Sequence, residues 1–128
     1  MNYGYQRIVK KPFEEVDTSI RKLLSEVGFG IITEINIQET FKNKLNLEYP
    51  KFKILGACNP QLAVQAMSIE TEVSLLMPCN VVLWENKNLT VTISRVDVEE
   101  QLRITNQEDL VQIGRDVNKQ LRSAIDKI

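Results

Sequence analysis

The sequence predicts an α+β domain, with a mostly antiparallel sheet of about five strands and two long helices packed on one face of the sheet. Two amphipathic helical stripes, one near the start of the chain and one at its end, enclose several segments with the pattern of strands. Two of these segments are separated only by residues 86–88, and so short a connection joins antiparallel neighbours. A wholly parallel α/β layering is the alternative, and this tight hairpin argues against it.

The first helix is expected to begin at Pro12, because proline suits the first helical turn, where its missing N–H has no partner to lose. Apolar side chains then recur at steps of three and four residues, with charged residues on the opposite face. These apolar positions are Phe13, Val16, Ile20, Leu23, Leu24 and Val27. Gly28 and Gly30 are expected to end the helix, since glycine readily adopts the left-handed conformation at a helix C-terminus.

The strands are expected at residues 3–10, 31–37, 51–58, 79–85 and 89–96. Residues 31–37 alternate between apolar and polar side chains, which predicts a half-buried strand. Asn86-Lys87-Asn88 forms the expected hairpin turn, because asparagine tolerates a positive φ. Short helices are expected after Asn36, which has capping-box spacing to Glu39, and over residues 60–69.

The last helix shows the clearest pattern in the chain. Thr105 and Glu108 have the spacing of a capping box, which predicts that the helix begins there. One helical stripe follows, and a stripe of this width is typical of a face packed on a core. Its members are Leu110, Ile113, Val117, Leu121, Ala124 and Ile128.

Length and composition predict one domain spanning residues 1–128 in a soluble protein. The chain has 16 basic and 17 acidic residues, interspersed, and this balance disfavours a nucleic-acid partner, since phosphate binding calls for a basic surplus. No apolar run is long enough for a signal peptide or a membrane span, so we expect a cytoplasmic protein without a membrane partner. In that reducing compartment a permanent disulfide between the two cysteines is not expected.

The 128 residues include no histidine. This excludes Ser-His and Cys-His dyads, histidine metal ligands and the usual pH switch. The segment Gly28-Phe29-Gly30 lacks the strand-to-helix context and the third glycine of a phosphate-binding loop. We therefore name no catalytic residue and no cofactor, and a non-enzymatic role is favoured.

Two short stretches are the candidates for a site. The first contains Cys58, Asn59 and Pro60: a strand ends, Asn59 can cap the next helix, and Pro60 can occupy its first position. Cys58 would then lie at a helix N-terminus, where free N–H groups favour a thiolate. The second stretch contains Pro78, Cys79 and Asn80, and it opens the following strand. If the two strands are antiparallel neighbours, both stretches lie at the same end of the sheet.

Three interpretations of the cysteines stay open. Free cysteine is among the most buried residue types, so two inert thiols are the plainest interpretation. The helix terminus supports a reactive or redox thiol at Cys58, with Cys79 assisting. A soft-metal site on Cys58 and Cys79 is the third, and without histidine it would need further ligands.

The stretches ILGACNP at residues 54–60 and LLMPCNVVL at residues 75–83 resemble the two hallmark segments of the domain of unknown function family 302. GFGIITEI at residues 28–35 is similar to the segment that follows the first helix in that family. The resemblance implies a compact α+β domain with a TATA-binding-protein-like order of strand, helix, four strands and helix, often a stand-alone bacterial protein. It implies no established activity. Two departures are Met77, in place of leucine, and Val98, in place of proline.

These observations favour a non-catalytic module that binds a small molecule or a partner near the two cysteine-containing stretches. We expect a homodimer, because dimers with twofold symmetry are the commonest oligomers. A thiol-redox or soft-metal protein using Cys58 and Cys79 is the alternative.

Overall fold

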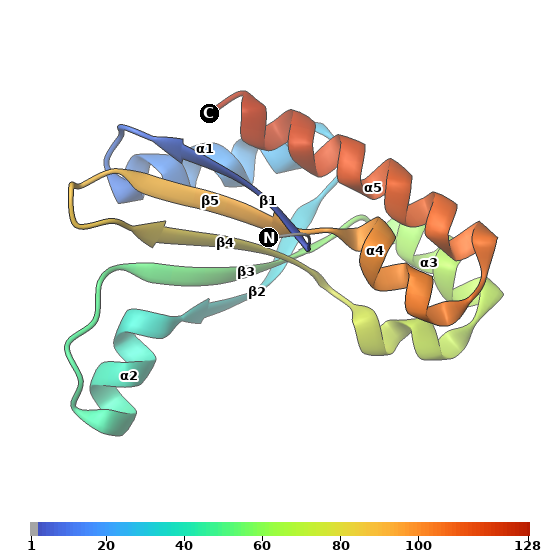
Figure 1. Cartoon of the computed structure of the whole chain (residues 1–128), viewed down its shortest axis with the longest axis horizontal. Helices are drawn as coiled ribbons and strands as arrows, with labels where there is room; N and C mark the ends of the chain where they lie inside the picture. The colour runs from blue at the N-terminus through green and yellow to red at the C-terminus, as the bar shows by residue number, and fades with distance from the viewer. Residues whose placement is uncertain (1–2) are drawn as a thin grey trace.

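The computed structural model describes residues 3–128. Its centre is a five-stranded sheet with strand order β1-β5-β4-β3-β2, in which every neighbouring pair is antiparallel. The strands are β1 (Gly4–Val9), β2 (Gly30–Asn36), β3 (Phe52–Cys58), β4 (Cys79–Glu85) and β5 (Val91–Val96). Figure 1 shows the sheet with its long helices. The predicted antiparallel α+β fold is therefore confirmed, and the parallel alternative is wrong.

The two long helices, α1 (Phe13–Glu26) and α5 (Glu108–Asp126), pack on one face of the sheet (Figure 1). Helix α5 buries the apolar stripe expected from the sequence, and α1 buries most of its stripe, with Leu23 and Val27 only partly buried. Beneath them, Val81 and Leu83 of β4 and Ile93 of β5 are completely buried. This layer forms the main core of the protein.

The hairpin between β4 and β5 forms as expected, with one difference in its turn. The strand expected to start at residue 89 begins at Val91, and the positive φ of 63° falls on Leu89, not on an asparagine. The asparagines instead close the turn through hydrogen bonds, since Asn86 N–H donates to the Thr90 carbonyl at 2.8 Å and Asn88 Oδ1 accepts from Thr90. The local composition thus predicted a turn but not its conformation.

The prediction that residues 31–37 form a half-buried strand is wrong about burial. Strand β2 is the last strand at one edge of the sheet, and no residue in it is buried. Ile32 and Ile35 are 61% and 48% exposed. A bulge between Ile31 and Thr33 also shifts the pairing register, so simple alternation does not describe the strand. Gly28, with a φ of 88°, ends the preceding helix, whereas Gly30 already belongs to β2.

Two of the short helices were expected. Helix α2 (Ile37–Leu45) begins after Asn36, whose side chain accepts a hydrogen bond from the Glu39 N–H at 3.0 Å, and it buries none of its residues. Helix α3 (Pro60–Ile69) follows β3 and continues into a 3-10 helix, η1 (Thr71–Leu76). No helix of the described residues is long and apolar enough to cross a membrane.

The start of α5 corrects a prediction. Thr105 does not cap α5, whose N-cap is Gln107; the Thr105 hydroxyl donates to the Leu102 carbonyl and accepts from the Gln107 N–H. The reason is a helix that the sequence analysis missed, α4 (Val98–Leu102), which continues into the 3-10 helix η2 (Arg103–Thr105). Asp97 caps α4 by accepting a hydrogen bond from the Glu100 N–H. Thr105 is therefore the end of one helical segment, not the beginning of the next.

Candidate functional site

Strands β3 and β4 are antiparallel neighbours, and this pairing brings the two cysteine-containing stretches together. Ala57, the residue before Cys58, pairs with Cys79 across the two strands. One strand ends and the other begins at this end of the sheet. A shared site requires the two strands to be antiparallel neighbours, and this arrangement is present.

Residue Asn59 forms the helix cap predicted from the sequence. Its side-chain oxygen accepts a hydrogen bond from the Leu62 N–H at 3.3 Å, and Pro60 is the first residue of α3. The amide nitrogen of Asn59 lies beside Gly28, where an added Cβ would approach it to 3.0 Å. The cap therefore sets the direction in which α3 leaves the sheet, and it also contacts the turn after α1.

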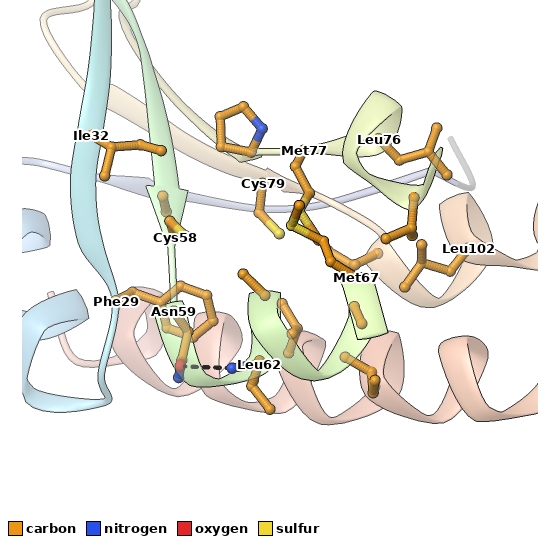
Figure 2. A pocket seen from close by; sticks show the side chains of 18 residues that line it. Phe29, Ile32, Cys58, Asn59, Leu62, Met67, Leu76, Met77, Cys79 and Leu102 are labelled. Carbon is orange, nitrogen blue, oxygen red and sulfur yellow. Dashed lines mark hydrogen bonds between the residues drawn. The ribbon is translucent and has the colours of Figure 1, made fainter. Parts of the chain in front are cut away.

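A cavity of about 260 Å³ opens between this end of the sheet and the surrounding helices. Its walls come from β3, β4, α3, η1, α4 and α5, together with the segment around Phe29 and Ile32. Figure 2 shows the side chains that line it, with the hydrogen bond of the Asn59 cap at one side. The exposed side chains of Ile32 and Met67 lie at its rim, and Met67 is 41% exposed.

The lining of this cavity is almost entirely apolar. Of its 18 residues, the only ones outside the aliphatic, aromatic, methionine and proline classes are Cys58, Asn59 and Cys79. No acidic or basic side chain belongs to the lining among the residues that the structure describes. Such a surface suits an uncharged molecule, because burying a charge here would leave it without a counter-charge.

The two thiols differ in their surroundings. Burial, and to a smaller extent the electrostatic influence of nearby Cys58, raise the pKa of the Cys79 thiol to about 11. Cys58 is partly exposed, at the end of β3 and just before α3. Neither cysteine forms a disulfide. In residues 3–128 no group of three histidine, cysteine or acidic side chains is arranged to hold a metal ion.

The six candidate residues divide into two sets. Cys58, Asn59, Pro78 and Cys79 all line the cavity. Pro60 and Asn80 are exposed and do not belong to its lining. Asn80 directly follows Cys79 in β4, and neighbouring residues of a strand point to opposite faces, so Asn80 lies on the other face of the sheet.

Pro78 packs against the sheet because Gly56 has no side chain. A Cβ on Gly56 would come within 2.7 Å of the Pro78 ring and would also overlap the Thr33 hydroxyl. The peptide bond between Met77 and Pro78 is cis. Gly56 thus allows the second stretch to approach the first closely.

Sequence reasoning missed the wall formed by α4 and α5. Val98 and Leu102 come from α4, and Ile113 and Val117 from α5. The two α4 residues are four apart and follow a capping aspartate, which is a recognisable helix signal. The α5 residues belong to the core stripe that the sequence predicts, and no local pattern indicates that part of this stripe faces a cavity.

Fold and cavity together define an α+β domain with an apolar cavity at one end of an antiparallel sheet. The family model described as "Domain of unknown function DUF302" matches residues 5–128, and the chain belongs to this family. The resemblance noted from the cysteine-containing stretches is thereby confirmed.

Among solved structures, the chain is similar to a crystal structure of an uncharacterized DUF302 protein from Bacillus stearothermophilus. The TM-score is 0.91 at 24% sequence identity, with 98% of each chain covered. This likeness supports the fold alone. No curated protein matches the chain.

Proposed function

We propose that this protein is a non-catalytic binding module that holds a small, uncharged, mostly apolar organic molecule in the cavity. The observation that carries the proposal is the cavity itself, about 260 Å³ in volume with an almost wholly apolar lining. Binding sites for small molecules are typically concave and apolar, with a few polar groups that orient the ligand. Here those groups would be Asn59 and the two thiols.

The size of the cavity limits the ligand. A buried apolar cavity of about 150 Å³ is known to bind benzene, so the larger volume here suits a molecule of about two fused rings or a branched chain. A non-catalytic role is supported by the uncharged lining, to which the described residues contribute no carboxylate or amine for general acid–base catalysis.

The test uses a neutral probe and its charged analogue. We expect 2-naphthol to bind and 2-naphthalenesulfonate not to bind, because no basic side chain of the lining would neutralise the sulfonate. Binding is measured by titration calorimetry and by amide chemical shifts in NMR spectra. The largest shifts are expected at Ala57, Ala63 and Ala66, which line the cavity.

A matched pair of variants on α3 locates the probe. Ala66→Leu extends a buried side chain of the lining into the cavity and is expected to weaken 2-naphthol binding at least about tenfold. Val64→Leu adds bulk on the same helix at a residue that is 66% exposed and outside the lining, so binding should be unchanged. Equal effects of the two variants, or no shift at any lining residue in the wild-type protein, would contradict the proposal.

A reactive or redox thiol at Cys58 remains the alternative, and the positions of the two cysteines support it. Cys58 lies at the N-terminus of α3, as the sequence suggested, and both thiols line the same cavity. The raised pKa of Cys79 counts against Cys79 as a thiolate at neutral pH. The homodimer expected from the sequence stays a separate prediction, which light scattering of the purified protein would check.

A further inference from the structure

The cavity gathers most of the sulfur in the protein. The chain contains two cysteines and three methionines, and four of these five residues line the cavity: Cys58, Cys79, Met67 and Met77. The fifth is Met1, which lies outside the described residues. The four come from four different segments, namely the end of β3, the start of β4, α3 and the residue after η1.

Figure 2 shows how these side chains lie. Met67 and Met77 extend from different segments toward the part of the cavity occupied by the Cys79 thiol. Cys58 enters from the end of β3. Methionine has three rotatable side-chain bonds, so the two thioethers can adjust their positions around a bound atom.

We propose that this cluster binds a soft monovalent metal ion, Cu(I), through the sulfur atoms of Cys58, Cys79, Met67 and Met77. Thiolate and thioether ligands select Cu(I) over harder ions, which prefer carboxylate, carbonyl and water oxygens. The two methionines supply the further ligands that a site on two cysteines alone lacked. This proposal shares the cavity with the organic ligand but does not depend on it.

The absence of charge from the lining also favours a monovalent ion. When Cu(I) replaces the proton of one thiol, a neutral copper–thiolate forms and one proton is released to solvent, with no change of oxidation state. The thioethers and the second thiol then add no charge. A neutral centre suits the apolar walls, whereas a divalent ion would reach neutrality only if both thiols lost their protons.

The other groups near the cavity are unsuited to a harder ion. Asn59, the only side-chain amide that residues 3–128 contribute to the lining, already accepts a hydrogen bond from the Leu62 N–H through its side-chain oxygen. No acidic side chain lines the cavity among the described residues. Zn(II), which takes four nitrogen, sulfur or oxygen ligands, would find only the two thiols of its usual set here.

The experiment is a competition for copper under anaerobic, reducing conditions. The full chain is titrated into the coloured Cu(I)–bicinchoninate complex, and loss of colour reports transfer of copper to the protein. We expect one Cu(I) per chain, with the same stoichiometry for Ag(I) as a second, redox-inert probe. Excess Zn(II) should not displace either ion.

The variants distinguish a four-sulfur site from thiols that bind copper alone. Met67→Leu and Met77→Leu keep the side-chain volume and remove only the sulfur, so each should lower the Cu(I) affinity on the order of tenfold without shifting the urea unfolding midpoint. Cys58→Ser should abolish the one-to-one transfer. Val64→Leu, at a residue of α3 that is 66% exposed and outside the lining, is the matched control and should leave the affinity unchanged.

Two results would overturn this site: no transfer of copper to the wild-type chain, or equal transfer to the wild type and to the Met67→Leu/Met77→Leu double variant. Binding of 2-naphthol is measured on the same variants and should persist in both methionine variants, since their volume is kept. Copper transfer therefore tests the metal site, and 2-naphthol binding tests the organic-ligand proposal independently.

Discussion

The two ends of strand β3 lie in opposite surroundings. At its start, Lys53 pairs with Asp17 of α1 at 2.8 Å, and Asp17 also pairs with Arg21 at 2.7 Å. Glu34 of β2 completes the network by pairing with Arg21 and, at 3.7 Å, with Lys53. At its end, Ala57 and Cys58 line the uncharged cavity.

The two regions differ in whether their chemical groups find partners within the chain. In the charged region each ionic group has a partner within the chain, so the network needs nothing from outside. In the cavity region the thiols and thioethers surround space that no side chain fills. Unfilled space with a distinct chemical lining points to a ligand, whereas a closed network of charges points to a structural role.

The largest loss of stability is expected from a substitution at the contact between α4 and α5, the two helices that form one wall of the cavity. Gly114 of α5 packs against the backbone of α4, and an added Cβ would lie 2.8 Å from the Val98 carbonyl oxygen and 2.9 Å from the Glu99 nitrogen. Gly114→Ala should therefore destabilise the protein by about 3 kcal/mol, although alanine gains about 1 kcal/mol of helix propensity over glycine.

Urea unfolding followed by circular dichroism measures this effect. Gly30→Ala is the control, because nothing lies within 4 Å of the Cβ that it adds, and its change should stay within about 0.5 kcal/mol. A stabilised Gly114→Ala variant would show that α4 is not held against α5 by this close approach.

The second prediction concerns the ion pairs of Asp17 and how much they stabilise the folded protein. Burial raises the pKa of Asp17, but the hydrogen bonds from Lys53 and Arg21 outweigh burial and hold the pKa below its ordinary value. A lowered folded-state pKa stabilises the protein above the unfolded pKa of about 3.9, and this stabilisation is lost as the pH falls through the folded value. Asp17→Asn should therefore cost about 2 kcal/mol at pH 7, and the cost should shrink as the pH falls through the lowered pKa of Asp17.

Urea unfolding at several pH values checks this prediction. Glu48→Gln is the control, since Glu48 is 85% exposed in its pair with Lys42 and should change stability by less than about 0.5 kcal/mol. A penalty for Asp17→Asn that does not depend on pH would mean that packing, not charge, is the source of stability there.

The smallest effect concerns the reactivity of the thiol in the cavity. With its pKa at about 11, Cys79 is almost wholly protonated at pH 8. In a Cys58→Ser variant, iodoacetamide should label Cys79 about ten times more slowly than a free cysteine, and the rate should keep rising with pH beyond 9. Mass spectrometry follows the labelling. A rate that levels off below pH 9 would show that the thiol is not desolvated.

Much of the fold could be predicted because its determinants are local. The stripe of α1, the hairpin around Asn86 and the cap at Asn59 each depend on residues within a few positions of one another. The burial of β2 could not be predicted, since alternation in its sequence does not reveal that it forms the edge of the sheet. The same limit explains the wrong prediction for Thr105. Its spacing to Glu108 fits a capping box, but its hydroxyl donates a hydrogen bond to the Leu102 carbonyl at the end of the preceding helical segment.

The candidate site was predictable in part for the same reason. Cys58 and Cys79 follow from two short stretches and from the direction of two neighbouring strands, which the order of elements indicates. In the sequence, Met67 and Met77 read as ordinary apolar residues, and only their placement around one cavity makes them candidate ligands.

Residue order along the chain decided the helices, the strands and the caps of this protein, because these depend on periodicity and on hydrogen bonds between near neighbours. The packing of α3, α4 and α5 around one end of the sheet decided that a cavity exists and which side chains face it. Cavities arise where distant segments fail to fill the space between them, and that depends on contacts that no local pattern records.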